Sequence, residues 1–394
     1  MRPLRILFSM ALGVVVMTGI VMAQANTWQP GPDLNIGRYG FPLVELPSGN
    51  LLAAGGVISG NGGFGAAAEA LDSGATAWTS VSPVPSPHRG RAHGVRLFSG
   101  SVLIVGEDPH IGSHPHPRSA YRYDEGSGTW TRTANDPTID RFLATVTLLP
   151  DGRLLFAGGY SGHSTGPTYQ TAEIYDPNTD SWSGTGAMAE VRTGHTATLL
   201  TAGPNAGRVL VVGGSNRAPS NTATTGCELY DPSSGIWSAT GSLHESRSLH
   251  TATLLPSGQV LVVGGQFTIS ATNRNSAELY DPQSGTWSLV AYMNVRRANQ
   301  TATLLLSGDV LVVGGAMGPG FNSPLTAVEV YDPQSDSWSV AASMATPRIL
   351  HNAALLPDGR IIVMGGLSNG AILSSSEIFD PGMVPVELMS FSIE

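Results

Sequence analysis

The chain of 394 residues contains no lysine, one cysteine and few charged side chains. All 20 of its basic residues are arginine, which excludes a Schiff-base lysine and the lysine of a phosphate-binding loop. The single cysteine, Cys227, excludes an internal disulfide and a cysteine-ligated zinc site. The net charge of −9 and the lack of a basic run argue against nucleic acid as a partner. Because 41% of the residues are apolar, we expect a folded chain with a packed core.

The two ends of the chain are expected to lie outside the folded domain. Residues 1–25 combine two arginines, an apolar stretch and an Ala-Gln-Ala site ending at Ala25, which is the pattern of a cleaved signal peptide. The protein is therefore expected to be exported from a bacterium (secreted, periplasmic or at the cell surface), with no stable membrane anchor after cleavage. Residues 26–382 form the predicted domain. Residues 383–394 are too short for a domain and are predicted to be a tail or the start of a domain that this chain lacks.

Tryptophan recurs at a nearly constant interval. Successive tryptophans are 50 to 55 residues apart, and none falls outside this register. Seven positions before each later tryptophan stands Leu71 or a tyrosine, and Phe379 continues the series. The second residue of a glycine pair precedes most tryptophans by 22 or 23 positions, but the second unit reads Gly106-Glu107 instead. Internal repeats of this kind define the architecture of a chain. The tryptophans are Trp28, Trp78, Trp130, Trp182, Trp237, Trp287 and Trp338.

Within each unit, short apolar runs alternate with turn residues. Segments such as Thr196–Leu200 and Glu278–Tyr280 have the length and composition of β-strands. The run Val260–Val263, which ends in a glycine pair, lacks polar alternation, as expected for a strand buried on both faces. No segment shows sustained helical periodicity. The sequence thus predicts an all-β fold with four short strands per unit.

The spacing of Gly-Gly, Tyr and Trp resembles the kelch repeat over nearly the whole of residues 26–382. This resemblance, to the superfamily of the galactose oxidase central domain, implies a seven-bladed β-propeller with four-stranded blades. Trp28 precedes the first repeat arginine and the last unit has no tryptophan, so we expect the N-terminal strand to complete the C-terminal blade and close the ring. The resemblance also implies that the loops after the glycine pairs and the loops between blades share one face. Because these loops vary, this face is the predicted binding face.

One arginine per unit stands at the start of the predicted inner strand. These arginines could form a ring that attracts anionic groups, or each could pair with the glutamate two residues before the tyrosine of its unit. Since the residue occurs in every unit, the structural interpretation is favoured. In the second unit Tyr121 takes the glutamate position, so Arg89 is expected to lack the regular partner. The series is Arg38, Arg89, Arg141, Arg192, Arg247, Arg297 and Arg348.

The second unit departs most from the repeat, and it is the predicted ligand site. It holds five of the ten histidines, and an acidic pair follows its single glycine. Such a cluster could bind a divalent metal, whereas the alternative is a proline-rich solvated loop; no other cofactor is predicted. The candidate metal ligands are His110, His114 and His116. The candidate binding residues are Arg89, His93, Glu107, Asp108, His110, His114, His116 and His163.

Three further histidines, His195, His250 and His351, share one repeat position three residues after the arginine. A position shared among units predicts packing or lining of the central channel rather than catalysis. Cys227 takes a position that Ala172 fills in a neighbouring unit, which predicts a buried small residue rather than the crosslinked cysteine of galactose oxidase.

No pair of acid and base residues stands out in the sequence, so we favour a binding function. The chain is expected to be a monomeric, exported module that binds a glycan or a protein through its variable loops. The alternative is a carbohydrate-active enzyme, similar to galactose oxidase or to a sialic acid epimerase, with Arg89 and the histidines of the second unit on the same face. A third interpretation is one module of a larger surface protein.

Overall fold

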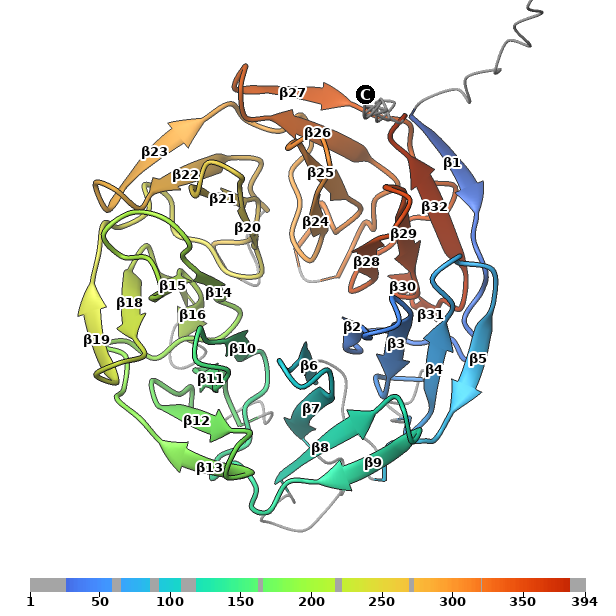
Figure 1. Ribbon diagram of the computed structural model, residues 1–394. Coiled ribbons are helices and arrows are strands. Elements are labelled where there is room, and N and C mark those ends of the chain that lie inside the picture. Colours follow the sequence, from blue (N-terminus) through green and yellow to red (C-terminus); the bar gives the residue numbers. More distant parts are fainter. Residues whose placement is uncertain are drawn as a thin grey trace, which may run out of the picture.

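The computed structural model describes residues 26–58, 65–85, 92–107, 118–161, 166–216, 222–268, 273–319 and 321–382. These residues form strands and turns, and no helix among them could cross a membrane. Seven four-stranded antiparallel sheets are arranged radially around a common axis (Figure 1). This arrangement confirms the predicted seven-bladed β-propeller.

Each blade runs from an inner strand at the axis to an outer strand at the rim, and blades one to seven are numbered in the order of the following ranges. The inner strands are β2 (Leu43–Glu45), β6 (His93–Arg96), β10 (Thr145–Leu148), β14 (Thr196–Leu199), β20 (Thr251–Leu254), β24 (Thr301–Leu304) and β28 (Asn352–Leu355). The second strands are β3 (Leu51–Ala54), β7 (Val102–Glu107), β11 (Leu154–Ala157), β15 (Val209–Val212), β21 (Val260–Val263), β25 (Val310–Val313) and β29 (Ile361–Met364).

The remaining strands complete the blades and two small loop hairpins. The third strands are β4 (Ala68–Leu71), β8 (Arg118–Asp124), β12 (Ala172–Asp176), β18 (Cys227–Asp231), β22 (Ala277–Asp281), β26 (Val328–Asp332) and β32 (Ser376–Asp380). The outer strands are β5 (Trp78–Val81), β9 (Thr129–Arg132), β13 (Ser181–Gly184), β19 (Ile236–Ala239), β23 (Thr286–Val290), β27 (Ser337–Val340) and β1 (Thr27–Pro30). The hairpins are β16 (Ser215–Asn216) with β17 (Thr222–Ala223), and β30 (Leu367–Ser368) with β31 (Ala371–Ile372).

The first strand of the fold closes the ring. β1 pairs antiparallel with β32, and Trp28 lies opposite Phe379 in this pairing (Figure 1). The predicted closure of blade seven by the N-terminal strand is therefore confirmed. It covers an edge of β32 that would otherwise be unpaired.

The hydrophobic core lies between neighbouring blades rather than in one central cluster. Leu210 of blade four and Val262 of blade five, for example, are fully buried in one such interface. At the rim, the ring of Trp237 lies 4.9 Å from that of Tyr230, and its indole N–H donates to the carbonyl of Gly186 in the preceding blade at 2.8 Å. The repeating Trp and Tyr thus fasten each outer strand to its own blade and to its neighbour.

Candidate functional site

The two sets of loops meet on one face of the propeller. In six blades, the residue after the repeat arginine forms a β-bridge with the residue after the glycine pair. We call this surface the loop face. The bridges are Tyr39–Val57, Phe142–Tyr160, Thr193–Ser215, Ser248–Gln266, Ala298–Ala316 and Ile349–Leu367.

Buried arginines hold these loops together. The Arg247 guanidinium donates to Glu278 Oε1 at 2.8 Å and to the carbonyl oxygens of Gly264 and Ser276 at 2.8 and 3.0 Å. Burial lowers the pKa of Arg247, and the Glu278 carboxylate opposes that shift. Because both side chains are fully buried, this pair is part of the scaffold and is not available to an anionic ligand. The other such pairs are Arg38–Glu69, Arg141–Glu173, Arg192–Glu228, Arg297–Glu329 and Arg348–Glu377.

The first glycine of each pair makes room for a side chain of the next blade. A Cβ atom on Gly158 would lie 2.5 Å from Cε1 of His195 and 2.8 Å from the carbonyl oxygen of Arg192. The φ angle of Gly158 is also +67°, which a side chain would strain. The glycine pair is therefore required for the close packing of the residue three positions after the arginine.

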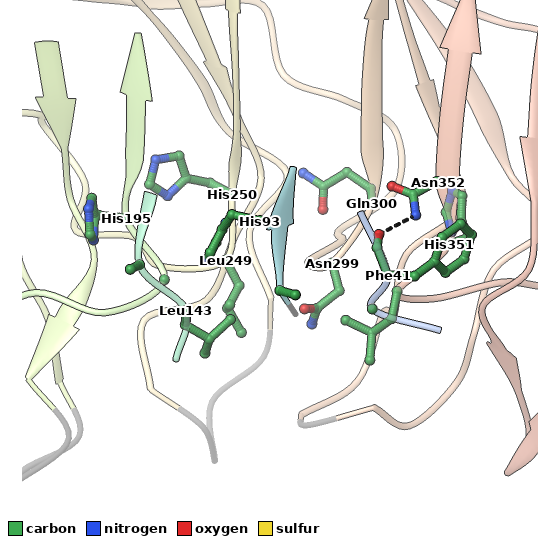
Figure 2. Close-up of a pocket in the computed structure, with 15 residues that line it drawn as sticks. Phe41, His93, Leu143, His195, Leu249, His250, Asn299, Gln300, His351 and Asn352 are labelled. Atoms are coloured by element: carbon green, nitrogen blue, oxygen red, sulfur yellow. Dashed lines mark hydrogen bonds between the residues drawn. The ribbon is translucent and has the colours of Figure 1, made fainter. Parts of the chain in front are cut away.

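At the loop-face end of the axis lies a cavity of about 270 Å³, which we call the mouth pocket (Figure 2). None of the residues that line it is charged by type as Arg, Lys, Asp or Glu. Part of its wall is a belt of residues in the left-handed conformation, where leucine costs roughly 1–2 kcal/mol. Backbone N–H groups in this belt donate to the carbonyl of the preceding blade, which compensates for that cost. The belt consists of Gly40, Leu143, Gly194, Leu249, Asn299 and Leu350.

The side chains next to the belt form a second layer of the wall. His195 Nε2 lies 3.0 Å from Oγ1 of Thr145 in the preceding blade. Burial lowers the pKa of His195 to about 3, and nearby arginines lower it further, so the ring is neutral at pH 7. Figure 2 shows His195, His250 and His351 around the pocket. The same contact joins His250 to Thr196 at 2.9 Å and His351 to Thr301 at 3.0 Å.

Blade six interrupts this pattern. Gln300 takes the histidine position, and its Nε2 donates to the carbonyl of Val263 at 2.9 Å. Three buried polar atoms there have no hydrogen-bond partner: Thr251 Oγ1, Gln300 Oε1 and Asn299 Nδ2. Buried polar atoms in proteins are normally paired, so this cluster is a candidate contact point for a ligand.

The structure describes only part of the site predicted in blade two. His93 begins β6 and lines the mouth pocket, with its ring 6.0 Å from that of Phe156. Glu107 ends β7, opposite Arg118. The other candidates lie outside the described residues and stay predictions: Arg89, Asp108, His110, His114, His116 and His163.

The described residues offer no ready metal centre. Across the described ranges, no three His, Cys, Asp or Glu side chains come together in a way that could hold a metal ion. Cys227 is buried, its Sγ lies 3.5 Å from the carbonyl oxygen of Thr225, and burial raises its pKa to about 12. A protonated thiol is a poor metal ligand, so Cys227 is not suited to bind copper.

The mouth pocket includes residues that the sequence reasoning did not single out. Asn299 and Gln300 follow a repeat arginine, and comparison of the units at the position of His250 would have shown Gln300 as the exception. The left-handed leucines carry no comparable signal, because leucine is seldom selected for that conformation.

A family model described as the KLHDC2/KLHL20/DRC7 Kelch-repeats domain matches residues 143–366, more than half of the chain. The chain belongs to the kelch-repeat family. This kelch chain is 24% identical to Kelch-like protein 15 of Danio rerio over 299 residues, which cover 71% of this chain and 39% of that protein. It is also 25% identical to the spermatocyte protein spe-26 of Caenorhabditis elegans over 175 residues, covering 43% of this chain and 29% of that protein. The kelch chain thus spans about two fifths of the length of the first relative or less.

Two solved structures share the propeller fold. A fungal alcohol oxidase of the AA5 family, in complex with copper, aligns with a TM-score of 0.71 at 16% identity, over 91% of this kelch chain and 77% of the oxidase chain. YjhT aligns with a TM-score of 0.59 at 13% identity, over 79% of this chain and 99% of its own. At these identities the likeness shows the fold alone.

The neutral histidines predict a loss of stability in acid. Burial lowers the pKa of His195 and His351 to about 3, and that of His250 well below its ordinary value. The unfolded chain, with histidine pKa values of about 6.5, therefore binds more protons than the folded chain below that pH. Each histidine is expected to lower the free energy of unfolding by about 1 kcal/mol per pH unit as the pH falls below about 6.5.

The three-fold variant His195→Gln/His250→Gln/His351→Gln isolates this effect, because Gln300 already occupies the same position in blade six. Urea unfolding followed by tryptophan fluorescence at pH 7 and pH 5 measures the slope with pH. We expect a flatter slope in the variant, and an unchanged slope would show that these histidines do not cause the acid sensitivity.

Proposed function

We propose that this kelch propeller is an exported binding module that takes a protein partner on its loop face and anchors one partner side chain in the mouth pocket. Kelch propellers typically serve as protein-interaction modules, and membership of that family supports a protein rather than a small molecule as ligand. The proposed export follows from the signal-peptide pattern of residues 1–25.

The mouth pocket is the observation that carries this proposal. Its volume of about 270 Å³ lies just below the range of roughly 300–1,000 Å³ typical of small-molecule sites. A pocket of this size on the axis suits one side chain of a partner whose remaining surface contacts the surrounding loops. The rigid blades hold the pocket, as expected for a binding site carried by loops on a stable scaffold.

Exposed apolar side chains on the same face support a protein partner. Phe267 of blade five, and Met317 and Phe321 of blade six, are 41%, 49% and 50% exposed in the loops after the glycine pairs. Asn273 Nδ2 connects these two loops, because it donates to the carbonyl oxygens of Ala316 and Gly318 at 2.6 and 3.0 Å. Aromatic residues and methionine are enriched at protein interfaces.

Selection from a random-peptide library on the immobilised full chain tests this function, with a glycan array run in parallel. Phe321→Asp is expected to weaken the selected peptides about tenfold or more, since it removes an apolar contact residue of the loop face. Leu306→Asp is the matched control. Leu306 is 76% exposed in the turn between β24 and β25, which lies on the opposite face, and its replacement should leave binding unchanged.

Two results would overturn the proposal. One is the absence of any peptide that binds the folded chain. The other is a set of ligands, peptides or glycans, whose affinity depends on Leu306 and not on Phe321. Turnover of a bound sugar, together with stoichiometric metal in the purified protein, would instead support the carbohydrate-active enzyme that the sequence left open.

A further inference from the structure

The interruption in blade six leaves hydrogen-bonding capacity unused at the mouth pocket. In the described contacts between blades three and four, four and five, and six and seven, a histidine occupies the threonine hydroxyl of the preceding blade. Between blades five and six that hydroxyl, on Thr251, has no partner. Gln300 is only 6% exposed and lines the pocket, and its Oε1 also has no partner.

The unused atoms are of two kinds. Gln300 Oε1 is an acceptor and needs a donor, whereas the Nδ2 group of the adjacent Asn299 is a donor and needs an acceptor. Figure 2 shows the two side chains at the wall of the same cavity. An unpaired buried polar group costs about 1–3 kcal/mol, so a ligand that pairs both groups gains more than one that pairs neither.

The chemistry of the wall excludes most side chains as the best occupant. A carboxylate offers acceptors only and would face the Gln300 oxygen, while an ammonium or guanidinium offers donors only. The lining residues include no Asp, Glu, Lys or Arg, so either charge would be desolvated without a counter-ion from these residues. An aliphatic group would leave every orphaned atom unpaired.

We propose that the mouth pocket selects a partner side chain that ends in a primary carboxamide, that of asparagine or glutamine. The carboxamide carries a donor and an acceptor on separate atoms, so its NH₂ group can donate to Gln300 Oε1 while its oxygen accepts from Asn299 Nδ2. A hydroxyl would have to make both bonds through one oxygen. This inference rests on the proposed function, because it names the group that the partner inserts.

The test measures the affinity of peptides selected on the wild-type full chain by isothermal titration calorimetry. Each peptide is compared with versions in which an asparagine or glutamine is replaced by Asp, Glu or Ser. The decisive variant is Gln300→His, which installs the residue found in three other blades opposite a threonine and removes the carboxamide from the wall. His351→Gln is the matched control, because it makes the opposite exchange in blade seven.

Selected peptides are expected to share an Asn or Gln whose replacement by Asp or Glu weakens binding about 5- to 100-fold. In Gln300→His that ratio should fall towards one, whereas His351→Gln should keep it. Binders that carry an acidic, basic, hydroxyl or aliphatic residue in place of the amide overturn the inference but leave the proposed function standing. An amide preference that persists in Gln300→His also overturns it. If no peptide binds any folded variant, the proposed function fails and this inference with it.

Discussion

Replacement of Arg247 by methionine is expected to lower the free energy of unfolding by about 3–5 kcal/mol, because it leaves a buried carboxylate without its counter-ion. Arg247 and Glu278 are both fully buried and lie 2.8 Å apart. The substitution also removes hydrogen bonds to the carbonyl oxygens of Gly264 and Ser276. The glycine-pair loop and the loop leading into β20 would then be joined only through their backbone contacts.

Arg360→Met provides the control for this result. Arg360 pairs with Asp358, which is 46% exposed, so its loss should cost about 1 kcal/mol or less. Urea unfolding followed by tryptophan fluorescence measures both variants. The double variant Arg247→Met/Glu278→Leu should recover part of the loss, since it removes the unpaired charge. Equal stability of Arg247→Met and Arg360→Met would contradict a structural role for the buried arginines.

Most of the fold could be predicted because its determinants recur in every unit. Trp237 and Tyr230 are seven residues apart, and the structure pairs them across β18 and β19. The all-valine and leucine strand β21 is buried, as its lack of alternation indicated. The place of Trp28 before the first arginine was enough to predict that β1 belongs to the last blade.

The mouth pocket could not be predicted in the same way. Its wall takes one or two residues from each of several blades, so no segment of the sequence carries it. Leu143 and Leu249 face it because their backbone is left-handed, and this conformation follows from hydrogen bonds between blades rather than from residue type. Gln300 differs from His250 by one substitution at a shared position, and only the structure shows the orphaned atoms that result.

The sequence reasoning instead favoured the blade with the most unusual residues. Of its candidates, His93 lies at the mouth pocket. This position places blade two beside the cavity that blades four to seven also line. A ligand on the axis would therefore contact blade two, and the predictions for its remaining residues concern the same face.

Removal of residues 26–30 is expected to have the largest effect on the assembly of the ring. β1 supplies four residues that pair with β32, and the Trp28 ring lies 5.1 Å from that of Phe379. The Trp28 indole also donates to the carbonyl of Ala342 in blade six at 2.7 Å. Without β1, the edge of β32 is unpaired and its apolar side chains are exposed, so we expect a lower melting temperature and association between chains.

Two measurements separate this closure from a general loss of packing. Trp28→Ala should destabilise more than Trp338→Ala, because β27 stays tethered to β26 by a short turn while β1 is held to β32 only by pairing and side-chain contacts. A synthetic peptide of residues 26–31 should restore the melting temperature and monomeric state of the truncated chain, since it can occupy the vacant edge. If truncation changed neither property, or if the peptide had no effect on a truncated chain that had become unstable, strand β1 would not be the element that closes the ring in solution.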